Sequence, residues 1–353
     1  MAYTAINDPE LYFQTKLYTG DGNSTQAITL DGSEDMQPDL NWIKNREAAN
    51  SHVIHDVLRG VGDELSSDSD AAEGTADPLA SFDSDGFTLG GSGGGINANT
   101  ETYVSWNWKA GTTSGISGSP SITPASYSFN ATAGQSIIKY VGNGTADATI
   151  PHGLSTAPKM VIIKNLTTQE GWVVGHEGMG WTKIMKLNTT AAEVTSSAYF
   201  GDVAPSATLV TLGDDGGVNT NTDNYIAYCF SEISGYSKFS SYTGNGNADG
   251  PFTFLGFRPA FVLLKNTERA EAWWLFDNKR DPHNLTSHAL QPNSTTAELN
   301  YTAADEFNID MLSNGFKVTA SDGAFNYSGE KIIYAAFAEA PFVNSEGVPC
   351  NAR

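Results

Sequence analysis

The stretch YTGNGN at residues 242–247 occurs almost unchanged twice more, as YTGDGN at residues 18–23 and as YVGNGT at residues 140–145. Strand-forming residues precede each copy, and an Asn-Gly or Asp-Gly pair supplies the two positions of positive φ that a type I′ hairpin turn requires. A phosphate-binding loop would end in Lys followed by Ser or Thr and would open a helix, and none of the copies does so. A structural turn that recurs three times indicates a module that recurs three times.

Other landmarks follow each turn in the same order and at nearly constant spacing. In each copy a proline precedes an apolar strand that ends in Lys-Asn, as in PDLNWIKN (38–45), PKMVIIKN (158–165) and PAFVLLKN (259–266). Each copy then has a glutamate preceded by alanine, and it closes on an apolar strand; these glutamates are Glu73, Glu193 and Glu298, and the closing strands end at Trp108, Phe230 and Phe337. A period of about one hundred residues predicts an internal triplication of a small domain.

The composition favours β-structure, because Gly is abundant, with 36 residues of 353, and only 17% of residues are charged. The apolar runs are short, rich in β-branched or aromatic residues, and bounded by turn signals. We therefore expect an all-β chain of three tandem antiparallel β-sandwich domains of jelly-roll or lectin-like type. The predicted boundaries are an N-terminal arm at 1–15, a first repeat at 16–110, a linker rich in Gly, Ser, Thr and Pro at 111–135, a second repeat at 136–235, a third repeat at 236–342 and a C-terminal tail at 343–353.

The net charge of −21 disfavours nucleic acid and anionic membranes as partners, because a polyanion is repelled by the field of the chain. The N-terminus has neither the basic region nor the apolar region of a signal peptide, and no apolar run is long enough for a membrane helix. The two cysteines form no metal-ligand pattern, and Cys229, within YIAYCF, is predicted to be a small core residue. No motif predicts a cofactor or a resident metal.

An acidic residue closes the short apolar run that follows each Lys-Asn strand. These residues are Asp56, Glu177 and Asp277. One interpretation is a salt bridge or turn cap, with the recurring Lys44, Lys164 and Lys265 as partners. The other is a carboxylate in a ligand site, and we retain all three acids as candidates for glycan contact.

Flat aromatic side chains are the second kind of candidate for glycan contact, because they stack on sugar rings. Trp172 and Trp273 are the residues selected on this ground. The cluster of His52, His55 and Asp56 has the residue types of a metal site, but the third copy places aromatic residues at both histidine positions, which favours packing. The acid pairs Asp56/Glu73, Glu177/Glu193 and Asp277/Glu298 are formally available for glycosidase chemistry, although no catalytic motif surrounds them. We predict no catalytic residue.

Several long phrases of the chain resemble a group of tailed-bacteriophage proteins that are common in marine phages, including cyanophages. The phrases include INDPELYFQTKLYTGDGN (6–23), QPDLNWIKNR (37–46), GYSKFSSYTGNGNADGPF (235–252) and PFVNSEGVPCNAR (341–353). Members of this group are usually called virion structural or tail-fibre proteins, and no functional residues can be transferred from them. The resemblance covers essentially the whole chain and implies synthesis in the host cytoplasm followed by assembly on the virion.

The first functional hypothesis is therefore a non-enzymatic virion protein on the exterior of the particle, a tail-fibre or adhesin subunit for host attachment. Its expected partners are other virion proteins of the tail or coat and host surface glycans, and by analogy with fibres it is expected to form a homo-oligomer, such as a trimer. The second hypothesis is a capsid decoration protein that binds the major coat protein. The third, from a different class, is an enzyme acting on host glycans.

Overall fold

The computed structural model describes residues 4–301, 307–321 and 323–350, and within them the fold is all-β, with several antiparallel sheets. The strands from the N-terminus to the middle of the chain are β1 (Phe13–Thr19), β2 (Gln26–Ile28), β3 (Leu40–Asn45), β4 (Val53–Asp56), β5 (Leu65–Ser66), β6 (Leu79–Asp83), β7 (Gly86–Leu89), β8 (Thr102–Trp108), β9 (Ser126–Asn130), β10 (Gln135–Val141), β11 (Ala148–Pro151), β12 (Met160–Asn165) and β13 (Val173–His176). The remaining strands are β14 (Lys183–Lys186), β15 (Val194–Thr195), β16 (Leu209–Leu212), β17 (Asn224–Phe230), β18 (Ser237–Thr243), β19 (Phe252–Phe254), β20 (Phe257–Asn266), β21 (Trp274–Asp277), β22 (His288–Ala289), β23 (Leu299–Asn300), β24 (Ile309–Leu312), β25 (Gly315–Val318) and β26 (Lys331–Pro341). The helices are a 3₁₀ turn, η1 (Pro9–Leu11), and two single turns, α1 (Ser197–Phe200) and α2 (Gly323–Asn326).

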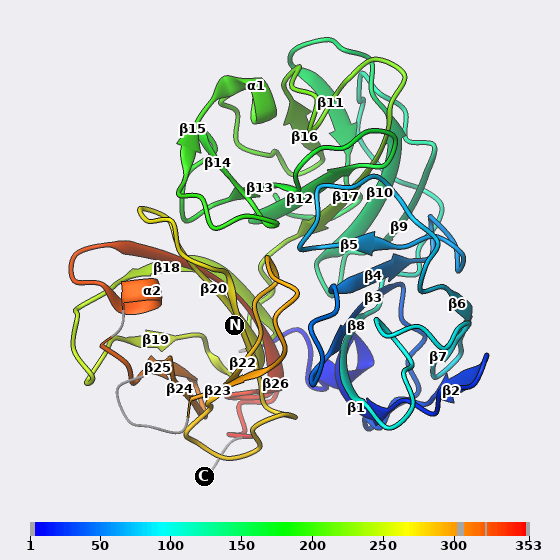
Figure 1. The fold of residues 1–353 in the computed structure, drawn as a ribbon. Helices are drawn as coiled ribbons and strands as arrows, with labels where there is room; N and C mark the ends of the chain where they lie inside the picture. The colour runs from blue at the N-terminus through cyan, green and yellow to red at the C-terminus, as the bar shows by residue number, and fades with distance from the viewer. Residues whose placement is uncertain (1–3, 302–306, 322, 351–353) are drawn as a thin grey trace.

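The strands gather into three lobes around a common centre (Figure 1). We name them unit 1 (β1–β8), unit 2 (β9–β17) and unit 3 (β18–β26). The large sheet of unit 1 has the order β1-β8-β3-β4-β5, that of unit 2 contains β10-β17-β12-β13-β14, and that of unit 3 is β18-β26-β20-β21. In each of these orders the strand named first (β1, β10 or β18) pairs with the last strand of its unit. The strand that contains the Lys-Asn pair lies on the other side of that last strand.

A second, smaller sheet covers one face of the large sheet, so each unit is layered like a sandwich. It consists of β2-β7-β6 in unit 1, β11-β16 in unit 2 and β19-β25-β24 in unit 3. In unit 1, for example, Ile43 and Tyr103 of the large sheet pack with Phe87 and Leu89 of the small sheet, and all four are buried. Burial of apolar side chains between two sheets is the usual driving force for such a layered β-fold.

The glycine turns lie where the chain leaves the large sheet for the small one, so the prediction of type I′ hairpins is wrong. The strands on either side of the first turn, β1 and β2, belong to different sheets. Only the second residue of each predicted pair has a positive φ, which is 68° at Gly22, 65° at Gly144 and 66° at Gly246. A type I′ turn needs positive φ at both central residues, whereas this turn needs a left-handed conformation at glycine alone.

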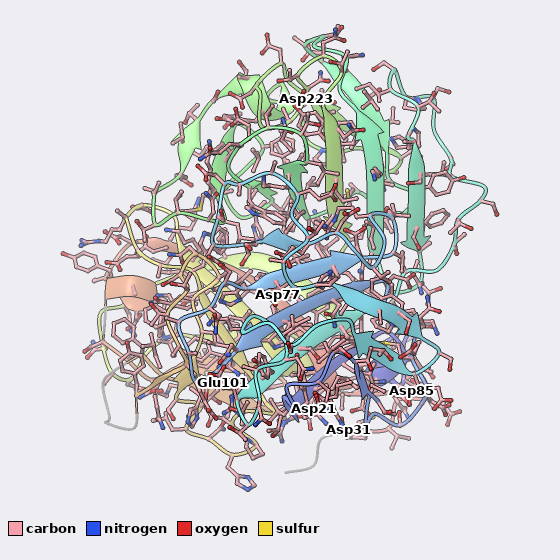
Figure 2. The ribbon with its side chains drawn as sticks, turned by 45° about the vertical axis from the view of Figure 1, so that its right-hand side comes forward. Asp21, Asp31, Asp77, Asp85, Glu101 and Asp223 are labelled. Carbon is pink, nitrogen blue, oxygen red and sulfur yellow. The ribbon has the colours of Figure 1, made fainter. Side chains whose placement is uncertain are left out.

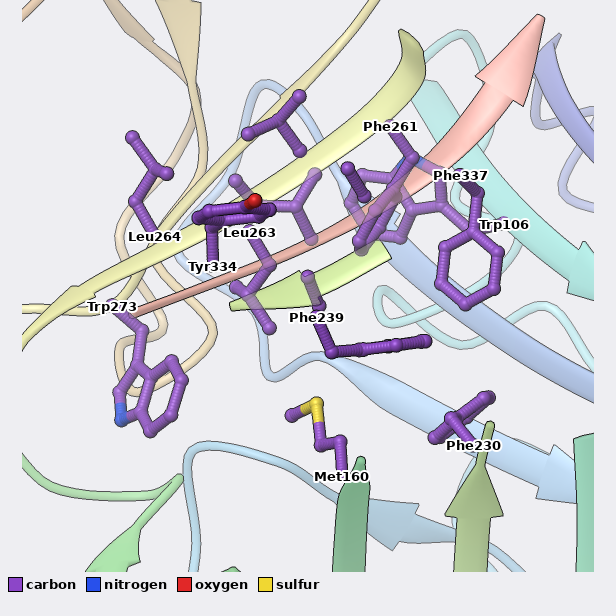
Figure 3. Packing of buried hydrophobic residues seen from close by; sticks show 14 of the residues in the cluster. Trp106, Met160, Phe230, Phe239, Phe261, Leu263, Leu264, Trp273, Tyr334 and Phe337 are labelled. Carbon is purple, nitrogen blue, oxygen red and sulfur yellow. The ribbon is translucent and has the colours of Figure 1, made fainter. Parts of the chain in front are cut away.

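The centre of the molecule is one hydrophobic cluster to which all three units contribute (Figure 3). Trp108 and Phe230 end β8 and β17, and Phe337 lies within β26; each of the three is paired in register with both neighbouring strands of its sheet. Their rings approach one another pairwise, with centroid distances of 6.5 Å for Trp108–Phe230, 5.6 Å for Trp108–Phe337 and 5.8 Å for Phe230–Phe337. A cavity of ≈ 40 Å³ beside them is lined by apolar and aromatic side chains and is too small for a sugar ring.

Parts of the segments predicted to be a linker and arms are packed into the fold. Within the predicted linker 111–135, strand β9 pairs with β10. Near the N-terminus, Ile6 is 3% exposed within the central cluster, and the Thr4 hydroxyl donates to the carbonyl of Ser234 at 3.0 Å. The predicted tail begins beside this region, since the Asn7 side chain donates to the Ser345 hydroxyl. The described parts of the predicted arm and tail therefore contact the rest of the fold; residues 1–3 and 351–353 lie outside the described residues.

Candidate functional site

The lysines of the three Lys-Asn strands are fully buried at the boundaries between units. Each ammonium group donates to the carbonyl of the following asparagine, at 2.9, 2.8 and 2.9 Å for Lys44, Lys164 and Lys265. Each also donates, at 3.2 Å, to a main-chain carbonyl of another unit: Lys44 to Thr295 of unit 3, Lys164 to Asp70 of unit 1 and Lys265 to Thr190 of unit 2. The predicted salt bridge between these lysines and the strand-end acids is therefore wrong.

Burial lowers the pKa of all three lysines to about 8, and nearby carboxylates oppose that shift. A group with this pKa is still mostly ammonium at neutral pH, and the surrounding carbonyl oxygens satisfy its donors. A buried ammonium group that donates to the main chain of another unit orients that unit without a carboxylate partner. The lysines thus mark a recurring contact between units.

The recurring glutamates make a second contact between the same pairs of units. The backbone N–H of each donates to the residue after a Lys-Asn pair, in Glu73–Leu166 at 3.4 Å, Glu193–Thr267 at 2.8 Å and Glu298–Arg46 at 2.8 Å. Unit 1 therefore donates a hydrogen bond to unit 2, unit 2 donates one to unit 3, and unit 3 donates one to unit 1. Three contacts of one kind that follow one another in this way close a ring.

The carboxylates of Asp56 and Asp277 are fully buried, and each forms an ion pair with the arginine that stands three residues later in the chain. The Arg59 Nε lies 2.6 Å from Asp56, and the Arg280 Nε lies 2.6 Å from Asp277. Backbone N–H groups also donate to both acids, as in the turn cap that was one of the sequence interpretations. Side chains held in this way are occupied by structural contacts.

The register of strand pairing corrects the sequence alignment of the middle copy. Leu40 pairs with Asp56 and Phe261 with Asp277, but the corresponding Met160 pairs with His176 and not with Glu177. Three residues after His176 stands Met179, where the other two units have arginine. Unit 2 thus replaces both members of the ion pair together, which avoids a buried charge without a partner.

These strand-end residues also contact the next unit in the ring. The Tyr228 hydroxyl of unit 2 donates to Asp56 of unit 1 at 2.7 Å, and the Trp106 Nε1 of unit 1 donates to Asp277 of unit 3 at 3.2 Å. The His176 Nε2 of unit 2 lies 3.1 Å from the Tyr334 carbonyl of unit 3. A second set of contacts therefore follows the same circular order.

The tryptophans selected for glycan contact do not reach the surface, since Trp172 is 0% exposed and Trp273 is 1% exposed. Each places its indole N–H against a carbonyl of the preceding unit, with Trp172 donating to Ser66 at 2.9 Å and Trp273 to Lys186 at 3.1 Å. A ring that stacks on a sugar must present a free face. The glycan prediction for these two residues is therefore wrong, because the contacts between units bury them.

Of the candidate acids, Glu177 alone has a substantially exposed side chain, at 46%. It lies 3.2 Å from Lys159 and accepts a hydrogen bond from the Trp181 indole, which is the main cause of its lowered pKa. The predicted acid pairs are tied to cations: Arg280 bridges Asp277 and Glu298, and Lys183 contacts Glu193. The structure does not bring the five candidate residues together into one site.

The histidines of the His52/His55/Asp56 cluster are buried and partnered within the core. The Trp42 indole donates to His52 Nδ1 at 3.0 Å, and His55 Nδ1 lies 3.1 Å from the Asp63 carbonyl. Among the described residues, no group of three His, Cys, Asp or Glu side chains is placed to hold a metal ion. Nor is any helix in the described part of the chain long and apolar enough to cross a membrane.

Buried neutral histidines make the fold sensitive to acid, and His55 offers a test. Burial, with a smaller contribution from Arg59, lowers its pKa to about 4 from 6.5. Between these two pH values the unfolded chain binds a proton that the folded chain does not, so stability is lost as pH falls through this window, by up to about 3 kcal/mol.

Unit 3 has Phe276 at the position of His55, and we expect His55→Phe to reduce the pH dependence of stability by nearly one bound proton. The measurement is the free energy of unfolding by urea from pH 7 to pH 4.5, compared with the unmodified chain. Asp39 and Asp77, whose pKa burial raises to about 6, titrate in both proteins and cancel in the difference. An unchanged slope would contradict the neutral, buried state of His55.

One set of structural residues was missed by sequence reasoning. A fully buried asparagine, Asn97, Asn219 or Asn326, accepts from the backbone of each glycine turn and also donates to it. The asparagines of the Lys-Asn pairs instead donate to acid side chains. Asn165 donates to Asp223 at 2.9 Å and Asn45 donates to Glu101, and the two acids lie in different lobes (Figure 2). The available signal was an asparagine that follows the turn glycine by 75 residues in units 1 and 2 and by 80 residues in unit 3.

These contacts define a layered all-β chain whose three units contact one another in a closed circular order. The chain belongs to the family described as a domain of unknown function, DUF7483, whose model matches residues 8–341. That single match includes strands of all three units. No curated protein and no solved structure matches the chain.

Proposed function

We propose that the chain is an internal triplication of one β-sandwich domain, of the jelly-roll or lectin-like type, and that its three copies form a pseudo-threefold ring. Three features support this proposal: the common strand order of the large sheets, the cyclic lysine and glutamate contacts, and the shared core. In this arrangement each copy contributes one side of every contact that another copy completes. A homotrimeric fibre would obtain such a ring from three chains, whereas here one chain contains it.

We further propose that this ring is a non-enzymatic structural protein on the exterior of a phage particle, and specifically a tail-fibre or adhesin subunit. The observation that carries this is that the recurring residues are used for contacts between units, where they are buried in ion pairs and hydrogen bonds. Catalytic side chains must reach a cleft that a substrate can enter, whereas Asp56 and Asp277 are buried in ion pairs with arginine. The resemblance to virion proteins of marine phages supports the location, and the virion proteins beside it would be its partners.

A second candidate, a capsid decoration protein, is favoured by the compact three-lobed shape of the described residues (Figure 1). A body of this shape fits a threefold position on a shell, where it would contact neighbouring coat subunits as a single chain. An enzyme acting on host glycans finds less support, because Asp56 and Asp277 are paired with arginine and buried.

The test is the location and copy number of the protein on intact virions. Cryo-electron microscopy of particles that carry a small tag on this protein should show the tag at the tail, with few copies per particle. Density repeated over the shell, in tens to hundreds of copies, would replace the tail proposal with the decoration proposal. Absence from purified particles would overturn both. Incubation with host polysaccharide should release no new reducing ends, and release that Glu177→Gln abolishes would establish the enzyme hypothesis.

A further inference from the structure

The three units differ in what covers the outer edge of the first strand in the large sheet. In unit 2 that strand is β10, and β9 pairs with it in antiparallel register from Gln135↔Asn130 to Lys139↔Ser126. In unit 3 the corresponding strand is β18, which is the last strand of its sheet among the described residues. The long connection between units 1 and 2 supplies β9, whereas β17 passes almost directly into β18.

In unit 2 the place that β9 occupies beside β10, which we call its seat, includes a glycine whose side has no room for a Cβ atom. A Cβ atom added to Gly153 would lie 2.7 Å from the ring of Phe129, the β9 residue that pairs with Ser136. Gly153 therefore provides the space that the aromatic side chain of β9 occupies. Phe129 is only 9% exposed in this position.

Unit 3 has a corresponding seat on β18. Its first residue, Ser237, already donates its N–H to the Ile233 carbonyl at 2.9 Å, and no described strand pairs with the rest of this edge. Ile150 pairs with Val210, and Thr253 pairs with Phe316 at the equivalent place in unit 3. Gly256, three residues after Thr253, therefore corresponds to Gly153, three residues after Ile150. Both glycines have a positive φ, of 85° and 73°. A Cβ atom added to Gly256 would meet nothing closer than the Phe254 ring at 3.8 Å, so the space above it is open.

A groove of ≈ 320 Å³ lies at this position. It is lined by residues that include Ser237, Lys238, Phe254, Leu255 and Gly256. The first two correspond to Gln135 and Ser136, to which β9 pairs, and the last corresponds to the glycine under Phe129. Phe254 is 55% exposed, whereas Pro151, its counterpart in unit 2, is buried.

Unit 1 does not offer this groove, because its own chain fills the equivalent place. Gln14, the counterpart of Lys238, accepts from the Gly32 N–H at 2.9 Å and donates to the Glu10 carbonyl at 2.9 Å. Lys238 instead donates to the Phe254 carbonyl at 2.9 Å, at the margin of the groove. The open seat is thus specific to unit 3.

The direction of the main chain completes the site. In unit 2 the Gly142 N–H donates to Asp223 beside β17, whereas the Lys139 carbonyl accepts from Ala125 beside β9. The main-chain groups of alternate residues therefore point to β17 and to β9 in turn. The Gly244 N–H likewise bonds to Glu330 beside β26, which directs the main-chain groups of Phe239 and Ser241 to the outer side. An exposed edge with outward N–H and C=O groups is a template for another strand.

We propose that the outer edge of β18 binds an extended segment of a different protein chain, which adds as an antiparallel strand and places an aromatic side chain over Gly256. The occupant has the chemistry of β9: small polar residues that alternate with aromatic residues. Its aromatic residue covers Phe254, and its backbone completes the sheet. This inference holds wherever the chain acts, so it does not depend on the proposed location on a virion.

The probe is a fluorescein-labelled peptide with the sequence of residues 124–131, PASYSFNA, added to the full chain, in which the seat of unit 2 is already occupied. We expect saturable binding at one site by fluorescence anisotropy, and slower hydrogen exchange at the amides of Phe239 and Ser241. A peptide with Ala in place of Phe129 should bind at least about tenfold more weakly. No saturable binding of the parent peptide up to about 1 mM would overturn the proposal.

The matched variants are Ser241→Pro, which removes one outward N–H from an edge strand where proline is tolerated, and Ser241→Ala, which retains it. We expect the proline variant to bind about tenfold more weakly and the alanine variant to bind normally, with both melting near the unmodified chain. Equal binding by both variants would exclude strand addition at this edge. Self-association of the chain that the proline variant abolishes would identify a second copy as the occupant and contradict a different chain.

Discussion

Replacement of Phe337 by alanine is expected to lower the free energy of unfolding by about 3–5 kcal/mol, the usual cost of removing a buried phenylalanine side chain. The Phe337 ring contacts rings of all three units, including Phe13 and Trp108 of unit 1, Phe230 of unit 2 and Phe239 of unit 3. The cavity would therefore form where the units meet and could not be closed by movement of one unit. The measurement is equilibrium unfolding in urea, followed by tryptophan fluorescence.

The control for this variant is Phe252→Ala, because Phe252 is 47% exposed on β19. We expect this change to alter stability by no more than about 0.5 kcal/mol, as for most surface substitutions. If Phe337→Ala behaved like the control, the aromatic centre would not contribute to stability as described.

The second large effect is expected at the buried ion pair of unit 1. Asp56→Ala leaves the Arg59 guanidinium buried with its nearest carboxylate removed and should cost about 3–5 kcal/mol. It also removes the acceptor of the Tyr228 hydroxyl, so part of the loss falls on the contact between units 1 and 2. Unfolding in urea at pH 7 measures this cost.

Unit 2 provides the matched control, because it has His176 and Met179 in place of the pair. The double variant Asp56→His with Arg59→Met copies that solution, and we expect it to cost less than half as much as Asp56→Ala. Removal of both charges avoids the penalty of a buried charge without a partner. A double variant as unstable as the sum of Asp56→His and Arg59→Met measured alone would show that the two residues act independently.

Much of the fold followed from local patterns in the sequence. The all-β class followed from composition and from short β-branched runs, and YIAYCF is a buried strand in which Cys229 is a fully buried core residue, as predicted. The Lys-Asn strands β3, β12 and β20 and the closing strands β8, β17 and β26 occupy the same positions in the three large sheets. Patterns of this kind could be read because each depends on neighbours along the chain and on alternation within one strand.

The arrangement of the units could not be predicted in the same way. Lys164 looked like half of a salt bridge because the sequence shows its chemistry but not the Asp70 carbonyl that approaches it from another unit. Trp172 looked like an exposed ligand contact for the same reason. The available signal was a lysine at the same position of three largely apolar strands, since a buried lysine needs several hydrogen-bond partners.

The most direct test of the ring is differential scanning calorimetry of the full chain at neutral pH. A shared core and circular contacts predict one transition, with a ratio of calorimetric to van't Hoff enthalpy of about 1. Asp56→Ala should shift that whole transition to lower temperature. Three separable transitions, or a ratio near about 3 with only one part of the heat absorption shifted by Asp56→Ala, would contradict the closed ring.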